Sequence, residues 1–177
     1  MNPARLWLVR HAQPLVAAGT CYGRLDLPAD ATATQAAAQR LAQALPTGAT
    51  AHCSTLQRCE QLALSTQALR PDLTINRDDR LREMDFGAWE GHAWDHIGQR
   101  AIDAWSTDFA LHRPGGGDNL AELLARVAAA LNDARRQARG GNDVVWFTHA
   151  GVARCVAWLL AHGERRMPRA DEWPVPA

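Results

Sequence analysis

The chain of 177 residues contains no lysine, so all of its formal positive charge comes from arginine. A Walker A phosphate loop and a Schiff-base mechanism each need a lysine, and the sequence therefore excludes both. Basic and acidic residues balance at 19 each, which gives a formal net charge of zero. Because this balance does not favour binding to a polyanion, we expect no nucleic-acid partner and no membrane partner.

Long apolar runs and paired cysteines are also missing. The apolar run at residues 6–9 is too short for a signal peptide, and no stretch approaches the length that spans a bilayer. The four cysteines, at positions 21, 53, 59 and 155, form no C-x-x-C pair. Free, partly buried thiols in a reducing compartment explain them most simply. We therefore expect a cytoplasmic protein.

The composition and the order of elements predict one α/β domain over residues 1–177. Hydrophobic residues make up 47% of the chain and charged residues 21%, as in a globular protein. Strands are expected at 4–10, within 48–54, at 72–77 and at 143–149, and helices at 32–45, 56–69, 120–138 and 151–163, with short helices within 94–109. This alternation favours a three-layer sandwich with a mostly parallel sheet and helices on both faces. Residues 165–177 are expected to form an irregular tail.

Two of the expected strands end in histidine, at His11 in "LWLVRH" and at His149 in "VVWFTH". Parallel strands bring their carboxyl ends to one edge of a sheet, where open α/β sheets keep their sites, so these residues are expected to meet. The strand ending in "HCSTLQR" leads Arg58 into the first turn of a helix, where backbone N–H groups favour anions. Arg58 and Arg10 then suit a phosphate gripped by bidentate hydrogen bonds.

Hydrolysis of a phosphomonoester also needs an acid to protonate the departing oxygen. The segment "RLREMDFGAWEG" offers Glu83, Asp85 and Glu90. The chemistry of the residues does not choose among the three.

Four blocks in order, "LVRHAQP", "CSTLQRC", "LREMDFGAWEG" and "WFTHAGV", resemble the histidine phosphatase superfamily, which includes the cofactor-dependent phosphoglycerate mutases. The resemblance implies a phosphoglycerate mutase-like fold and hydrolysis through a phosphohistidine, with no cofactor and no metal. It makes His11 the nucleophile and Glu83 the general acid and base. Arg10, Arg58 and His149 are then the groups that bind the phosphoryl group.

The sequence departs from the family pattern at two places. Ala12 follows the nucleophile where the family usually has glycine. Relatives that act on protein phosphohistidine also have alanine at this position. The usual T-x-x-N segment is replaced by residues 14–17, and Gln13 is a candidate for the missing phosphate contact.

The stretches "GTCYGRLDLPAD" and "RPGGGDNLAELLARV" resemble those of the α-ribazole phosphatases within this superfamily. This likeness implies a small-molecule substrate, α-ribazole 5′-phosphate, which is dephosphorylated during assembly of the cobalamin nucleotide loop. Tyr22, Arg24 and Asp26 follow the nucleophile closely and are expected at the rim of the pocket.

Three other interpretations remain open. His92 and His96 have the spacing of zinc ligands on one helical face, although the glutamate of an H-E-x-x-H motif is absent. A phosphatase of broad specificity, or one acting on phosphohistidine in proteins, would fit the same motifs. A protein of this fold that binds phosphorylated ligands without turnover is the non-enzymatic alternative. The sequence does not predict an oligomeric state.

Overall fold

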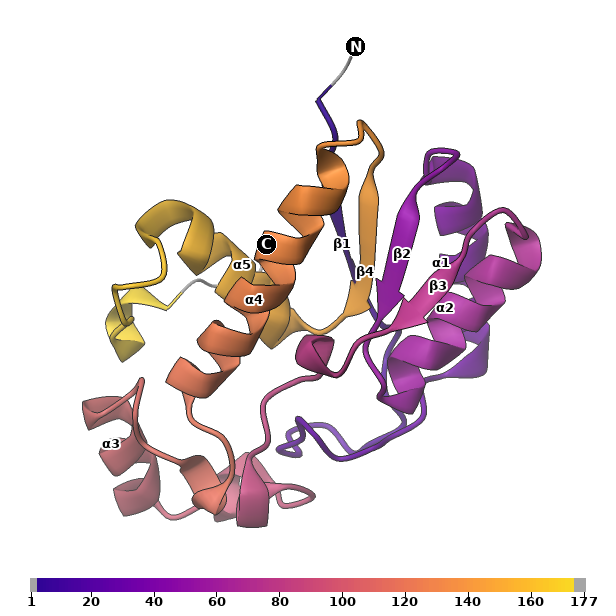
Figure 1. The fold of residues 1–177 in the computed structure, drawn as a ribbon. Coiled ribbons are helices and arrows are strands. Elements are labelled where there is room, and N and C mark those ends of the chain that lie inside the picture. Colours follow the sequence, from indigo (N-terminus) through magenta and orange to yellow (C-terminus); the bar gives the residue numbers. More distant parts are fainter. Residues whose placement is uncertain (1–2, 174–177) are drawn as a thin grey trace. The chain divides into compact units, whose positions relative to one another are not determined.

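Four strands form one sheet in the computed structural model, which describes residues 3–173. They are β1 (Leu6–Arg10), β2 (Thr50–Cys53), β3 (Ile75–Arg77) and β4 (Val144–Thr148). The strands lie in the order β1-β4-β2-β3, and every neighbouring pair is parallel (Figure 1). All four carboxyl ends therefore lie at the same edge of the sheet. The predicted mixed α/β fold with a parallel sheet is confirmed.

The five α-helices are α1 (Ala31–Ala44), α2 (Gln57–Leu69), α3 (Gln99–Thr107), α4 (Leu120–Ala138) and α5 (Ala150–His162). A capping box stands at the start of α4: the backbone N–H of Glu122 donates to Asn119 Oδ1 at 2.8 Å. The backbone N–H of Asn119 donates in return to Glu122 Oε2 at 3.4 Å. These two bonds satisfy N–H groups that the helix itself leaves without a partner.

The described residues group into two compact units. The first contains residues 3–15, 26–82 and 129–149, and the second contains 16–25, 83–128 and 150–173. The prediction of a single domain stays a prediction.

The sheet of the first unit has a helix on each face. Buried residues of β2 and β4, such as Ala51, Val145 and Phe147, form one hydrophobic core with residues of α1 and α2, which lie side by side (Figure 1). On the opposite face of β2, His52 Nε2 contacts Gln137 Oε1 of α4 at 3.0 Å. Strands covered on both faces are typical of parallel sheets, and β4 is buried along its whole length.

Two strand predictions need correction. The apolar run of β1 suggested a buried strand, but β1 lies at the end of the strand order, and Leu8 is 37% exposed. The strand predicted at 72–77 begins only at Ile75. Before it, the backbone N–H of Leu73 donates to Arg70 O at 3.0 Å, and Gln67 Nε2 donates to Leu73 O at 2.8 Å. These turn contacts replace strand pairing at residues 72 and 73, whereas Thr74 O still accepts from Ala51 N–H of β2 at 3.4 Å.

The second unit is organised around aromatic side chains. Trp105 lies 5.9 Å from Phe86 and from Trp89 between ring centroids in edge-to-face contacts, and it stacks on Phe109 at 5.5 Å. Such contacts add to the burial of the rings themselves. Nearby, a Cβ on Gly115 would lie 2.1 Å from Phe86 O, so the glycine run permits a close approach of two backbone segments. Trp89 and Trp105 therefore pack on other rings of their own unit.

The C-terminal segment packs on α5 over the described residues. Trp158 Nε1 of α5 donates to Arg166 O at 2.8 Å, and the ring of Trp173 lies 6.3 Å from that of Trp158. Residues 170–172 form one 3-10 helix. The expected tail continues over residues 174–177, which lie outside the described residues.

The four cysteines are free and buried. Burial raises the pKa of both Cys21 and Cys53 to about 12, with a smaller contribution from the carboxylate of Glu90 for Cys21 and of Glu60 for Cys53. No helix within residues 3–173 combines the length and the apolar character that crossing a membrane requires.

Candidate active site

His11 and His149 stand directly after two neighbouring strands. Arg10 of β1 is paired in register with Thr148 of β4, and the backbone N–H of His11 donates to Thr148 O at 3.3 Å. The next residue of each strand is a histidine, and the centroids of the two imidazole rings lie 5.1 Å apart. The sequence prediction that these histidines meet at one edge of the sheet is confirmed.

His11 is held as a neutral imidazole with its lone pair on Nε2. Its Nδ1 lies 2.7 Å from the carbonyl oxygen of Ala12, which only accepts, so the proton is on Nδ1. Burial, together with the charges of Arg58 and Arg10, lowers the pKa of His11 to about 4, although the bond to Ala12 opposes this shift. At neutral pH the side chain is therefore unprotonated at Nε2, as a nucleophile must be.

Arg58 brings a buried positive charge to the same place. It is the second residue of α2, its side chain is fully buried, and its Nε donates to His11 Nε2 at 3.3 Å. The side chain of Leu56 cannot cap this helix, and Asp26 supplies the cap from a distance: Gln57 N–H donates to Asp26 Oδ1 at 2.7 Å. Asp26 thus fixes the helical turn that carries Arg58.

Arg10 is the last residue of β1 and is exposed. Its charge contributes to the lowered pKa of His11. Gln13 is exposed, and its backbone oxygen accepts from Asp30 N–H at 2.8 Å. Its proposed phosphate contact stays a prediction.

Ser54 is a member of this group that the sequence analysis did not single out. It follows β2, its Oγ lies 2.8 Å from His149 Nε2, and it is fully buried. Its position at the carboxyl end of a parallel strand could have identified Ser54, because the same position identified the two histidines. His11, His149 and Ser54 thus follow three successive strands of the sheet.

Glu83 belongs to the second unit, where its carboxylate accepts two backbone hydrogen bonds. Gly151 N–H, in the first turn of α5, donates to Oε2 at 2.9 Å, and Met84 N–H donates to Oε1 at 3.1 Å. A Cβ on Gly151 would lie 2.0 Å from Glu83 Oε1, so the carboxylate can occupy this position only when residue 151 is glycine. The carbonyl oxygen of Glu83 accepts from Arg126 Nη2 at 3.0 Å.

The other two candidate acids have structural partners. The carboxylate of Glu90 accepts from the backbone N–H groups of four residues, at Gly23, Arg24, Leu25 and Phe86. Asp85 accepts from Gly87 N–H at 2.7 Å and pairs with Arg24 Nη1 at 3.2 Å. With four backbone N–H donors, the Glu90 carboxylate has a structural role in holding residues 23–25.

The expected rim residues divide between the units. Asp26 caps α2 in the first unit, whereas Arg24 and the partly buried Tyr22 belong to the second. Their role in substrate recognition stays a prediction.

His92 and His96 do not share a helix. His92 follows Gly91, which has a φ of +83°, and His96 ends a 3-10 helix that begins at Trp94. Within residues 3–173 the structure contains no cluster of three side chains suited to hold a metal ion.

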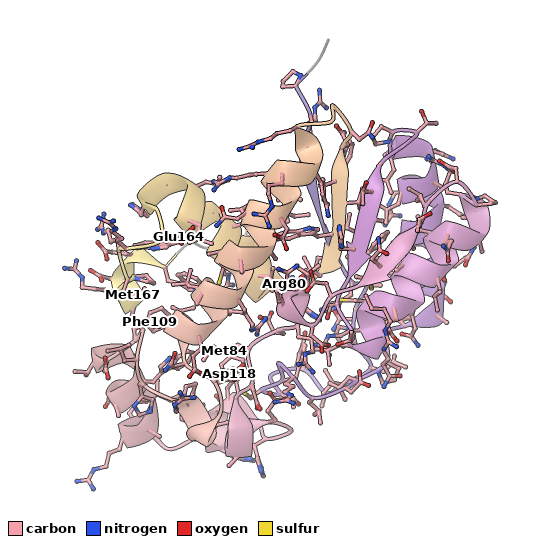
Figure 2. The ribbon with its side chains drawn as sticks, in the orientation of Figure 1. Arg80, Met84, Phe109, Asp118, Glu164 and Met167 are labelled. Carbon is pink, nitrogen blue, oxygen red and sulfur yellow. The ribbon has the colours of Figure 1, made fainter. Side chains whose placement is uncertain are left out.

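Two open hollows lie in the second unit. One, of about 290 Å³, is lined in part by Trp89, His92 and His96. The other, of about 520 Å³, lies where the end of α3 meets the C-terminal segment, and Phe109 and Met167 line it (Figure 2). The residues that line them include none of the predicted catalytic side chains.

The model of the histidine phosphatase superfamily (branch 1) matches residues 6–173, and the chain belongs to this family. A 6-phosphofructo-2-kinase/fructose-2,6-bisphosphatase from Caenorhabditis elegans is 29% identical over 159 residues, which cover 87% of this chain and 33% of that protein. The chain thus spans about a third of the length of this curated relative.

Solved structures agree with the family assignment. TTHB049 from Thermus thermophilus is 34% identical with a TM-score of 0.70, over 88% of this chain and 84% of that one. A mycobacterial glucosyl-3-phosphoglycerate phosphatase is 26% identical with a TM-score of 0.75, over 89% and 79% of the two chains. Membership of the family supports the predicted phosphatase activity.

Proposed function

We propose that this chain hydrolyses phosphomonoesters through a phosphohistidine formed on His11. The observation that carries the proposal is the state of this imidazole: its proton is tied to Ala12 O, and its Nε2 lies 3.3 Å from a buried guanidinium nitrogen of Arg58. A neutral nucleophile beside fixed positive charge suits attack on a phosphate dianion, because the charge attracts the anion without protonating the nucleophile.

The proposed reaction has two steps. In the first, His11 Nε2 attacks phosphorus in line, the bond from phosphorus to the ester oxygen breaks, and Glu83 gives its proton to that oxygen. In the second, the Glu83 carboxylate takes a proton from water, the hydroxide attacks phosphorus, and the bond to Nε2 breaks. Arg10, Arg58 and His149 bind the phosphoryl oxygens and take the role that a metal ion has in other phosphatases. The role of Glu83 rests on its position in the "LREM" block.

For the substrate, we propose α-ribazole 5′-phosphate, within assembly of the cobalamin nucleotide loop. The support is the pair of stretches at residues 19–30 and 113–127, which resemble those of α-ribazole phosphatases. The structure connects the two: Glu90 accepts from backbone N–H groups of 23–25, and Asp118 N–H donates to Asp85 O at 2.9 Å, five residues before Glu90. Both stretches are thus held by one segment, residues 85–90.

The test is release of phosphate in the presence of EDTA from α-ribazole 5′-phosphate, fructose 2,6-bisphosphate, glucosyl-3-phosphoglycerate, a phosphohistidine peptide and simple phosphomonoesters. His11→Ala and Glu83→Gln run in parallel. Selective turnover of α-ribazole 5′-phosphate that His11→Ala abolishes supports both parts of the proposal. Unselective turnover that depends on His11 removes the cobalamin assignment. Turnover that survives His11→Ala overturns the mechanism.

Binding without turnover is the remaining alternative, and a second measurement distinguishes it. A protein that only binds phosphorylated ligands would gain thermal stability from phosphate and from the esters but would release no product. Acid-labile, alkali-stable labelling of wild-type protein in a rapid quench, absent in His11→Ala, would identify the phosphohistidine and exclude this alternative.

A further inference from the structure

We infer that the hydroxyl of Ser54 fixes His149 in the tautomer that carries its proton on Nδ1. Ser54 lies directly after β2, and its backbone N–H donates to Phe147 O at 2.9 Å, which holds it against β4. Its Oγ lies 2.8 Å from His149 Nε2. Both side chains are buried, with 0% of Ser54 and 1% of His149 exposed.

The direction of this hydrogen bond follows from counting protons. A serine hydroxyl has one proton to donate and two lone pairs. Leu56 N–H donates to Ser54 Oγ at 3.3 Å and occupies one lone pair. Over residues 3–173, His149 Nε2 is the one acceptor that the hydroxyl proton contacts. If Nε2 carried a proton of its own, the buried hydroxyl would donate to nothing, which is costly.

The neighbouring thiol does not take over this role. Cys59 Sγ lies 3.4 Å from His149 Nε2 and 3.9 Å from His149 Nδ1, but it also lies 3.4 Å from Thr148 O, which can only accept and competes for the single thiol proton. A thiol is in addition a weaker donor than a hydroxyl. Ser54 is therefore the group that decides which nitrogen of His149 is protonated.

The two histidines then share one tautomer, with the proton on Nδ1 and the lone pair on Nε2. In His11 the Nδ1 proton is given to Ala12 O, and the Nε2 lone pair faces the buried guanidinium of Arg58. In His149 the Nε2 lone pair accepts from the neutral hydroxyl of Ser54. In the proposed reaction His11 Nε2 is therefore the nucleophile, and His149 keeps its ring proton on Nδ1. This consequence for catalysis rests on the proposed function, whereas the tautomer does not.

Ser54 is thus a positioning residue, and nitrogen NMR tests it directly. In uniformly ¹⁵N-labelled protein at pH 8, two-bond ¹H–¹⁵N correlations distinguish a protonated ring nitrogen from an unprotonated one. The His149 ring is assigned by its loss in His149→Gln. We expect Nδ1 to be protonated and Nε2 to be unprotonated in the wild type. A protonated Nε2 would overturn the inference, and this result requires no Ser54 variant to fold.

Two variants then separate the hydroxyl from the thiol. Ser54→Ala should shift His149 to a mixture of tautomers and lower kcat/KM about tenfold, the effect of losing one hydrogen bond to a reacting group. Cys59→Ala, the matched control on the other side of Nε2, should keep the proton on Nδ1. An unchanged tautomer in Ser54→Ala, or a changed one in Cys59→Ala alone, contradicts the assignment to Ser54.

The readouts also separate this inference from the proposed function. If the wild type hydrolyses none of the esters but shows Nδ1 protonated, the inference about Ser54 holds and the proposed function fails. If Ser54→Ala changes the tautomer but turns over substrate at the wild-type rate, the role of the tautomer in catalysis is overturned.

Discussion

His11 and His149 lie 138 residues apart in the chain, yet their rings are 5.1 Å apart because each follows one of two paired strands in the same register. The nitrogens of the two rings have different partners, a backbone carbonyl for His11 and a serine hydroxyl for His149. The parallel sheet therefore brings the two side chains together, while the residues around them set what each ring can do.

The lowered pKa of His11 predicts the acid limit of activity. Protonation of Nε2 removes the nucleophile, and the pKa is lowered from 6.5 to about 4. We expect kcat/KM, calculated on the concentration of the substrate's phosphate dianion, to fall below about pH 4, where His11 of the native protein binds a proton, and not near pH 6.5. Arg10→Met removes one of the charges that lower the pKa, so the acid limb should move to higher pH. An acid limb near 6.5 in the wild type would contradict a buried, neutral His11.

The same shift affects folding. Between pH 6.5 and about 4 the unfolded chain binds a proton at His11 that the native protein does not bind. Stability therefore rises with pH in this window, and the contribution present above pH 6.5 is lost as the pH falls through about 4. Urea unfolding of the wild type and of His11→Ala should show a smaller loss in the variant over this window.

Asp26 offers a choice between a structural role and a substrate contact. Its carboxylate caps Gln57 at the start of α2, which carries Arg58. Asp26→Ala should lower the free energy of unfolding by about 1 kcal/mol and reduce kcat/KM for all substrates alike. Asp26→Asn keeps an acceptor and should retain most of both. Loss of preference for one ester without loss of stability would instead favour the predicted rim role.

Much of the site could be predicted from the sequence because it depends on local pattern and parallel pairing. An apolar run that ends in a polar residue marks a strand end, and this placed His11 and His149 correctly. The exposure of β1 could not be predicted, since "LWLV" has the same pattern at the end of a sheet as in its centre. Strand order is set by pairing between distant segments.

The missed features depend on contacts over long separations. The spacing of His92 and His96 suggested one helix, but Gly91 N–H donates to Cys21 O and Cys21 N–H donates to His92 O. These bonds to a segment 70 residues away hold an irregular turn. The requirement for glycine at position 151 likewise follows from Glu83, which approaches from far along the chain.

The cysteines should be unreactive in the native protein. All four thiols are buried, and burial raises the pKa of Cys21 and Cys53 to about 12. Because the thiolate is the reactive form, we expect a thiol reagent such as DTNB to react with native protein at pH 8 at the rate of unfolding only. In guanidinium chloride all four should react at once. Fast reaction of one native thiol would show that this thiol is accessible.

Removing the charge of Glu90 should mainly affect stability, whereas removing the charge of Glu83 should mainly affect turnover. Glu90→Gln places an amide NH2 among four backbone N–H donors, so the free energy of unfolding should fall by about 1–3 kcal/mol. Glu83→Gln gives up one of only two backbone hydrogen bonds, so it should lower the melting temperature less than Glu90→Gln does, and it should abolish turnover. Thermal melts and steady-state rates of both variants check this pattern. A stable, inactive Glu90→Gln together with an active Glu83→Gln would transfer the acid role to Glu90.

Gly151→Ala tests whether the position of the Glu83 carboxylate at the start of α5 is needed for turnover, without changing any titratable group. The added Cβ would lie 2.0 Å from Glu83 Oε1, so the carboxylate must leave its position at the start of α5. If that position is the productive one, kcat should fall at least about tenfold, because proton transfer depends on placement of the acid. Stability should change little, since alanine is the better helix former and offsets part of the clash.

The control for this variant is Gly98→Ala, because an added Cβ there would meet no heavy atom within 4 Å beyond the adjoining residues, and the φ of Gly98 is an ordinary −57°. It should retain the wild-type rate. In a Glu83→Gln background, Gly151→Ala should cause no further loss, because both changes act on the same proton transfer. A Gly151→Ala protein with wild-type kcat would show that Glu83 works from a different position, reached by moving away from α5.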